Sequence, residues 1–103
     1  MDLVLTISEH SKNVFNFSKY TQQDQNKNVI GIKEATGDLN QMITIRRLCP
    51  DLKMYCGDDG IIVPAMSIGS YGLISVISNY CPKIVNLIIS RCKENNYMGA
   101  FEL

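Results

Sequence analysis

The sequence has little of what membrane-spanning, exported or nucleic-acid-binding proteins need. Its 103 residues carry ten basic and ten acidic side chains, so no basic region predicts nucleic acid or anionic lipid as a partner. No apolar run approaches the roughly 18 residues of a transmembrane helix. The first residues have no basic segment and too short an apolar run for a signal peptide, so we expect a cytoplasmic protein.

Metal and nucleotide motifs are also missing. The four cysteines (Cys49, Cys56, Cys81 and Cys92) form no C-x-x-C pair, and the only histidine, His10, lies far from them in the sequence. No metal site is therefore predicted, and the cysteines are expected to be reduced and mostly buried. The glycines form no G-x-G-x-x-G or Walker pattern, so no nucleotide cofactor is predicted.

The composition that remains is that of one globular domain. Hydrophobic residues make up 46% of the chain and charged residues 19%. No repeat or linker divides residues 1–103, and the polar stretch over residues 21–28 is expected to be a loop. A chain of this length buries only a modest core.

Three short apolar runs predict strands, over residues 29–32, 53–56 and 72–76. They do not alternate apolar with polar residues, which is typical of strands buried on both faces. Helical spacing surrounds them, over residues 8–20, 38–49, 61–68 and 82–92. This alternation predicts parallel βα units. Three strands fit a small open sheet as well as a piece of a barrel.

Several residues are expected to shape the ends of these helices. Asp38 stands where an N-cap belongs, and Pro50 ends the helix that follows it. Pro64 lies inside the third helix and is expected to kink it, whereas Gly69 suits its C-cap. Pro82 suits the first turn of the last helix.

Lys33 is the residue with the most chemistry to explain. It lies at the carboxyl end of the first predicted strand, where active sites of parallel α/β folds are built. One interpretation is structural, with the ammonium group reaching solvent or pairing with Glu34 or Asp38. The other is catalytic, because desolvation lowers the pKa of a lysine and the neutral amine attacks carbonyl carbon to form a Schiff base.

The other charged pairs have simpler interpretations. Asp58 and Asp59 follow the second strand and are expected to cap the next helix rather than bind a metal. Arg46 and Arg47 are expected to be solvated charges near a helix C-terminus rather than a phosphate site.

Three blocks of sequence resemble a known family in order and spacing. They are Gly31–Asp38 (GIKEATGD), Tyr55–Asp59 (YCGDD) and Gly72–Asn79 (GLISVISN). They resemble the dihydrodipicolinate synthases, pyruvate-dependent class I aldolases built on a (β/α)₈ barrel. The resemblance implies that the chain is a partial TIM barrel, with three parallel βα units matching strands six to eight and a leading helix.

The resemblance also implies specific roles. Lys33 matches the lysine that forms the imine with pyruvate, and the resulting enamine adds to aspartate-4-semialdehyde on the route to diaminopimelate and lysine. Gly57 and Ile74 match positions that line the pyruvate pocket, which must stay dry to keep the lysine neutral. Glu34 and Thr36 are assigned support rather than chemistry. No cofactor and no metal are implied.

A complete barrel of about 250 residues is far longer than this chain. The tyrosine of the proton relay and the arginine that binds the aldehyde substrate have no matching motif before Lys33. We therefore expect a fragment with little activity alone. Its open sheet edges and exposed barrel interior predict self-association, poor solubility or a complementing barrel fragment.

Two other functions fit the same motifs. The chain could be a non-catalytic half-barrel remnant that docks into a full-length relative. It could instead come from another Schiff-base aldolase such as an N-acetylneuraminate lyase, although the KEATGD block favours dihydrodipicolinate synthase.

Overall fold

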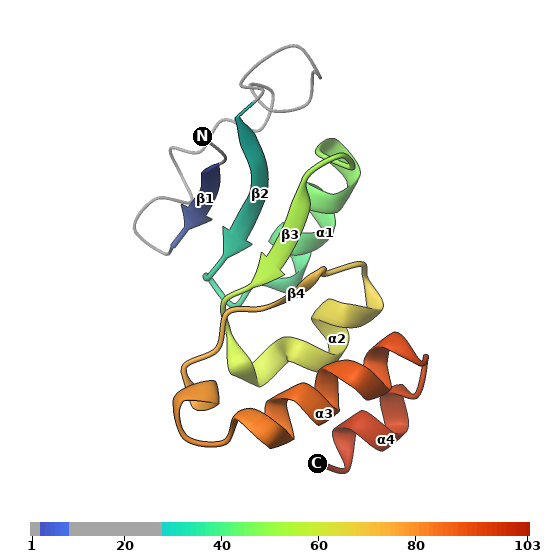
Figure 1. Cartoon of the computed structure of the whole chain (residues 1–103). Helices are drawn as coiled ribbons and strands as arrows, with labels where there is room; N and C mark the ends of the chain where they lie inside the picture. Colours follow the sequence, from blue (N-terminus) through green and yellow to red (C-terminus); the bar gives the residue numbers. More distant parts are fainter. Residues whose placement is uncertain (1–2, 9–27) are drawn as a thin grey trace.

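The computed structural model of the chain describes residues 3–8 and 28–103 (Figure 1). Within these residues, parallel strands form one sheet in the order β1-β2-β3-β4. The strands are β1 (Leu3–Ile7), β2 (Val29–Glu34), β3 (Lys53–Cys56) and β4 (Gly72–Leu73). The parallel α/β architecture predicted from the sequence is confirmed.

Within residues 3–8 and 28–103, four α-helices and two short 3₁₀ segments connect and follow the strands. They are α1 (Leu39–Leu48), η2 (Asp59–Ile61), α2 (Ile62–Ser67), η3 (Ile77–Asn79), α3 (Pro82–Lys93) and α4 (Tyr97–Phe101). Helix α1 lies behind β3 in the view of Figure 1, and α2, α3 and α4 pack together near β4. Among the described residues, no helix is long and apolar enough to cross a membrane.

The core lies between the sheet and these helices. Alternate strand residues point into it, because successive side chains of a strand project to opposite faces. Its buried members are Ile7, Ile32, Met42, Ile45, Met54, Cys56, Ile62, Val63, Ala65, Cys92 and Ala100. The four cysteines are free, and all except the exposed Cys81 are buried, as expected. Burial raises the pKa of the Cys49, Cys56 and Cys92 thiols, which keeps them protonated and unreactive.

The structure corrects three expectations about the strands. The first strand, β1, was missed, although its residues LVLTI form an apolar run rich in β-branched side chains; it pairs with β2. The last strand is shorter than predicted and ends at Leu73. Burial on both faces is wrong for β3, which alternates between buried Met54 and Cys56 and more accessible neighbours, whereas the consecutive residues Gly31 and Ile32 of β2 are both buried.

The predicted helix ends are largely confirmed. Asp38 caps α1, and its carboxylate accepts hydrogen bonds from the N–H groups of Asn40 and Gln41. Pro64 is the third residue of α2, where a backbone N–H has no partner within the helix, so the expected kink is wrong. Gly69 follows α2 with a φ of 98°, a left-handed conformation that favours glycine. The helix predicted over residues 8–20 lies almost entirely outside the described residues.

Candidate functional site

Three hydrogen bonds join the carboxyl ends of the four strands into one rim. Each runs from a backbone N–H just beyond one strand to a carbonyl at the end of its neighbour. The pairs are Ala35 to Ile7 at 2.8 Å, Gly57 to Glu34 at 2.8 Å, and Ile74 to Cys56 at 2.9 Å. The predicted site residues Lys33, Gly57 and Ile74 therefore come from consecutive strands at the same end of the sheet.

Lys33 lies on β2, on the face of the sheet opposite the buried core. Its Cα pairs with Thr6 of β1 and Tyr55 of β3, and its neighbours Ile32 and Glu34 point into the core instead. The lysine side chain is half-buried. Lys33 thus lies on a partly sheltered surface of the sheet.

Gly57 lies directly against the Lys33 side chain. A Cβ atom at this position would lie 2.9 Å from Lys33 Cε and 2.9 Å from Ala35 Cβ. Glycine is therefore required here to leave room for the lysine stem. Ile74 is one strand further along the rim, and 44% of its surface is exposed.

We expect Gly57→Ala to lower both stability and the reactivity of Lys33. The new methyl group would also lie 3.0 Å from the Ala35 Cα, which is backbone and cannot swing aside. Crowding of this kind typically costs about 1–3 kcal/mol. Gly72→Ala is the matched control, since its Cβ would meet Tyr55 ring atoms at an ordinary 3.8 and 3.9 Å. Thermal unfolding compares the melting temperatures of the Gly57→Ala and Gly72→Ala variants. Equal melting temperatures would contradict the prediction.

The residues after Lys33 form a ladder of side-chain caps that fixes the turn into α1. Glu34 Oε1 accepts a hydrogen bond from the Thr36 N–H at 2.6 Å. Thr36 Oγ1 accepts one from the Asp38 N–H at 3.2 Å, and Asp38 in turn caps the helix. Gly37 has a φ of 78°, which few other residues adopt. Glu34, Thr36 and Asp38 thus position the strand end that carries Lys33.

Glu34 is fully buried, which is unusual for a carboxylate. Burial raises its pKa, as do the nearby charges of Asp38 and Asp58, while the hydrogen bonds from Thr36 lower it. Its Oε2 has no hydrogen-bond partner among the residues that the structure describes. The fold therefore favours the protonated, neutral form of this side chain.

This raised pKa predicts a pH-dependent stability. Above the ordinary carboxyl pKa of 4.5, the unfolded chain releases the Glu34 proton while the folded chain holds it, so folding stability falls as pH rises towards the folded pKa. Glu34→Gln keeps an acceptor for Thr36 but cannot ionise. We expect the free energy of unfolding of the native chain to fall relative to this variant as pH rises above 4.5. Urea unfolding across pH tests this, with the exposed Glu94→Gln as control; a constant difference would refute it.

Asp58 and Asp59 accept hydrogen bonds from different parts of the chain. Asp58 caps η2 by accepting a hydrogen bond from the Gly60 N–H at 2.9 Å, as predicted. Asp59 instead accepts hydrogen bonds from the N–H groups of Val76 and Ile77, both at 3.1 Å, and from the Ser75 hydroxyl. It therefore fixes the loop that follows β4. No local pattern signals this contact, because the partners lie 16–18 residues apart.

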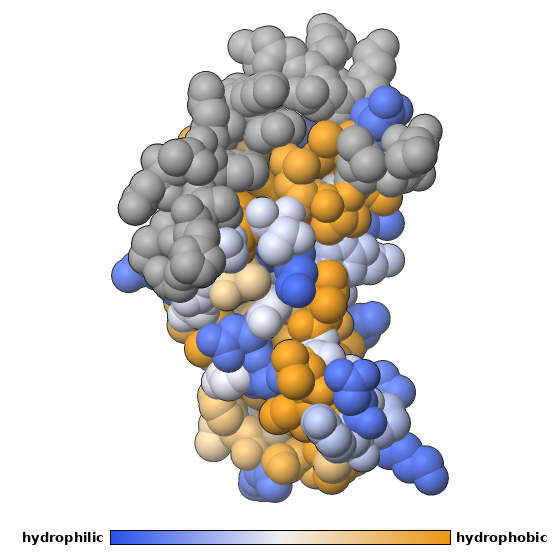
Figure 2. Space-filling view, turned by 90° about the vertical axis from the view of Figure 1, so that its left-hand side faces the viewer, coloured by the Kyte–Doolittle hydropathy of each residue, from blue (hydrophilic) through white to orange (hydrophobic). Residues whose placement is uncertain are grey.

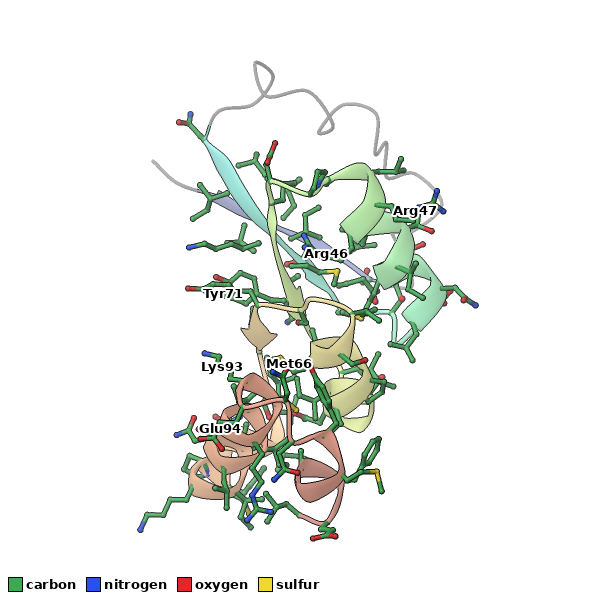
Figure 3. The ribbon with its side chains drawn as sticks, turned by 90° about the vertical axis from the view of Figure 1, so that its right-hand side faces the viewer. Arg46, Arg47, Met66, Tyr71, Lys93 and Glu94 are labelled. Atoms are coloured by element: carbon green, nitrogen blue, oxygen red, sulfur yellow. The ribbon has the colours of Figure 1, made fainter. Side chains whose placement is uncertain are left out.

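A second group that the sequence analysis missed lies on the same sheet face as Lys33. The Tyr55 ring passes close to Gly31 and Gly72 and meets the Tyr71 ring edge-on, with centroids 5.6 Å apart. Lys53 Nζ lies 4.7 Å from the centre of the Tyr71 ring. In Figure 3, Tyr71 projects from the side of the sheet away from α1. These aromatic side chains form a wall beside Lys33 on the face that the helices leave open.

The arginines of α1 have the structural role predicted for them. Both lie in its last turn, and Arg46 Nη1 donates a hydrogen bond to the Pro50 carbonyl at 3.2 Å (Figure 3). Their charges face the negative end of the helix dipole. Among the described residues, no group of three or more histidine, cysteine or acidic side chains could hold a metal ion.

The fold and the lysine at its rim define a class, the parallel α/β barrel proteins with a lysine at the carboxyl end of a strand. The sequence model of the Dihydrodipicolinate synthetase family matches residues 7–103. The chain belongs to this family, whose members are lyases.

Curated relatives show the same relationship. The chain is 51% identical over 63 residues to the 4-hydroxy-tetrahydrodipicolinate synthase of Endomicrobium trichonymphae, covering 60% of this chain and 22% of that one. It is 44% identical over 78 residues to the enzyme of the same name from Alkaliphilus oremlandii, covering 75% and 27%. The chain thus spans about a quarter of the length of these relatives.

Solved structures confirm a partial TIM barrel. The 4-hydroxy-tetrahydrodipicolinate synthase of Methylacidiphilum fumariolicum superposes with a TM-score of 0.71 at 32% identity, over 76% of this chain and 26% of that one. N-acetylneuraminate lyase from Fusobacterium nucleatum gives 0.84 at 22% identity, over 98% and 35%, which shows the fold alone. The same lyase solved as a complex with pyruvate gives 0.70 at 26% identity, over 75% and 26%.

Proposed function

We propose that the chain carries the Schiff-base lysine of a 4-hydroxy-tetrahydrodipicolinate synthase and that this lysine is Lys33. The observation that supports it is the position of Lys33 at the strand end, with Gly57 leaving space for its side chain and the Glu34–Asp38 ladder fixing the turn that follows. Two curated relatives at 51% and 44% identity carry that enzyme name.

The proposed chemistry begins with the neutral amine of Lys33. Its nitrogen attacks the keto carbon of pyruvate, and loss of one water gives an imine. A base then removes a proton from the pyruvate methyl group, which leaves an enamine. The enamine carbon adds to the aldehyde carbon of aspartate-4-semialdehyde, and hydrolysis of the product imine restores the lysine.

Turnover by this chain alone is proposed to be slow. In the family that the chain resembles, an earlier strand carries the proton-relay tyrosine and the arginine that binds the aldehyde substrate. The part of this sequence before Lys33 contains no motif that matches either residue. General acid–base catalysis typically contributes about 10²–10⁴-fold in rate. Imine formation needs only the amine and a sheltered carbonyl, so this first step is what the chain itself is equipped to perform.

Trapping of the imine tests the proposal. The chain is incubated with pyruvate and sodium borohydride, which delivers hydride to the imine carbon and leaves a stable secondary amine. Mass spectrometry of the intact chain and of its peptides then shows whether one adduct forms and where. An adduct on the peptide that holds Lys33 supports the proposal. No adduct, while a full-length relative is labelled in parallel, would favour the second candidate.

That second candidate is a non-catalytic half-barrel that docks with a partner. The open sheet face beside Tyr71 favours it, since a complete barrel buries this surface. A sialic-acid-type lyase activity has less support, because the match to N-acetylneuraminate lyase is only 26% identical.

A further inference from the structure

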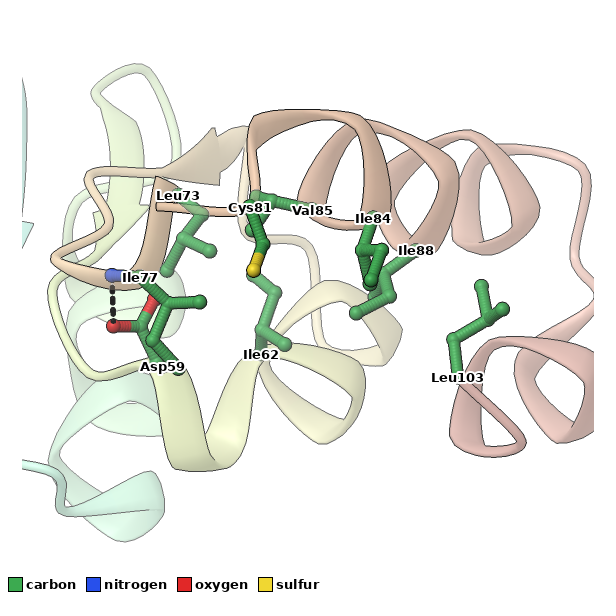
Figure 4. A pocket seen from close by; sticks show the side chains of 9 residues that line it. All are labelled: Asp59, Ile62, Leu73, Ile77, Cys81, Ile84, Val85, Ile88 and Leu103. Carbon is green, nitrogen blue, oxygen red and sulfur yellow. Dashed lines mark hydrogen bonds between the residues drawn. The ribbon is translucent and has the colours of Figure 1, made fainter. Parts of the chain in front are cut away.

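The loop that follows β4 is attached to the rim through one carboxylate. β4 has only two residues, and the Ile74 N–H directly after it donates a hydrogen bond to the end of β3 at 2.9 Å. The Asp59 carboxylate then accepts hydrogen bonds from the Ser75 hydroxyl and from the N–H groups of Val76 and Ile77, both at 3.1 Å. Figure 4 shows the bond to Ile77. The backbone on the carboxyl side of Ile74 is therefore held by Asp59.

The loop is also held together by hydrogen bonds between its own residues. Ser75 Oγ accepts a hydrogen bond from the Ser78 N–H at 2.9 Å, and the Ser78 hydroxyl donates one to the Ser75 carbonyl at 2.8 Å. These bonds make residues 75–78 a compact turn. A displacement at Asp59 is thus expected to move the turn as one piece, together with the adjoining Ile74.

Burial of apolar side chains contributes less to the position of this loop. Val76 is 68% exposed and Ile77 is 49% exposed in the part of the chain that the structure describes. In Figure 1 the loop runs towards the left of the molecule, and Figure 2 shows from that side hydrophobic surface interspersed with hydrophilic side chains. Hydrogen bonds to an ionised group are roughly twice as strong as neutral ones. The bonds to Asp59 are therefore the contacts that fix the loop.

Asp59 is itself fixed close to the lysine. It lies two residues after Gly57, which lies against the Lys33 side chain, and it begins η2, which Asp58 caps. The thiol of the buried Cys56 donates a hydrogen bond to the Asp58 carbonyl at 3.1 Å. The short segment from Gly57 to Asp59 thus connects the surroundings of the lysine to the loop after β4.

We propose that Asp59 is a positioning residue for pyruvate, because it holds Ile74 at the rim as one side of the pocket in which Lys33 meets the keto carbon. The inference rests on the proposed function, in which Lys33 forms the imine and Ile74 lines the pocket. The carboxylate of Asp59 is turned to its three donors, so it acts through the loop and not on the substrate. Misplacement of a reacting group by about 1 Å can lower rates by about 10²-fold.

The dependence of imine formation on pyruvate concentration tests the inference. The chain is incubated with pyruvate and sodium cyanoborohydride, which reduces imines in preference to free ketones, and the initial rate of adduct formation on the Lys33 peptide is measured. For Asp59→Ala we expect the half-saturating pyruvate concentration to rise at least about tenfold. Loss of folded protein alone would lower the rate at saturation and leave this concentration unchanged.

Asp58→Ala is the matched control. It removes the neighbouring carboxylate and the hydrogen bond from the Gly60 N–H, but that bond lies within η2 and does not reach the loop after β4. We expect its half-saturating concentration to stay close to the native value. Asp59→Asn is the conservative variant, since its carbonyl oxygen accepts the loop N–H groups, and we expect it to restore most of the loss.

Ser75→Ala keeps the inference testable if Asp59→Ala does not fold. It removes the hydroxyl that donates to Asp59 and accepts the Ser78 N–H, while Asp59 keeps its bonds to the two backbone N–H groups. We expect the half-saturating pyruvate concentration to rise, by less than in Asp59→Ala. A Ser75→Ala chain with the native value would contradict the proposed role of the loop.

Hydrogen exchange of the Val76 and Ile77 amides measures the loop directly. We expect faster exchange at both in Asp59→Ala and native exchange in Asp58→Ala. Faster exchange without a change in pyruvate dependence would overturn the inference and leave the proposed function standing. A native chain that forms no adduct, beside a full-length relative that does, would contradict the proposed function itself and this inference with it.

Discussion

Lys33→Arg is expected to abolish the borohydride-stable pyruvate adduct while leaving the fold intact. The guanidinium group stays protonated in proteins, so it cannot attack the keto carbon. Arginine retains a long stem that fills the space beside Gly57. Peptide mapping of the labelled chain measures the effect, and far-ultraviolet circular dichroism checks the fold.

Lys53→Arg is the matched control for this experiment. Lys53 lies on the adjacent strand, and its ammonium group sits over the Tyr71 ring rather than at the rim. We expect the adduct to form undiminished in this variant. Persistence of the adduct in Lys33→Arg, or its loss in Lys53→Arg, would show that the reactive amine has been misassigned.

The second large effect is expected in the core. Ile45→Ala removes a side chain that is 1% exposed and packs between α1 and the sheet. Truncations of this kind leave a cavity and cost about 2–5 kcal/mol. Since domains of this size are stable by only about 5–15 kcal/mol, we expect a large fall in the midpoint of urea unfolding.

Ile43→Ala is the control for the core substitution. It makes the same chemical change two residues away on the same helix, at a position that is 42% exposed. We expect its unfolding midpoint to change little. Equal destabilisation by the two variants would mean that α1 does not pack on the sheet through Ile45.

The hydrophobic pattern was sufficient to locate three of the four strands. β2 and β3 are runs of apolar residues bounded by polar turns, and the capping residue Asp38 and the first-turn Pro82 mark where helices begin. These features are local, so the residues that form them are neighbours in the sequence. β1 carries the same kind of local signal, the apolar and β-branched run LVLTI, but was not predicted as a strand.

Some features of the candidate site were likewise predictable from the sequence, and others were visible only in the structure. The GIKEATGD block predicted Lys33 through its resemblance to a family, and the later blocks predicted Gly57 and Ile74 as positions that line the pyruvate pocket. The contact between Gly57 and the lysine stem, the link from Asp59 to the loop after β4, and the aromatic wall around Tyr55 join residues that are far apart in the chain.

By itself, the sequence determined the alternation of strands and helices, the helix caps and the lysine motif, since each depends on hydrogen bonding and hydropathy over a few residues. Only the tertiary structure decided which strand faces pack in the core and which stay open. It also decided that Glu34 is buried with a raised pKa while the adjacent Lys33 points the other way. The physical reason is that burial depends on which strands and helices meet, and pairing over long separations leaves no mark in local sequence.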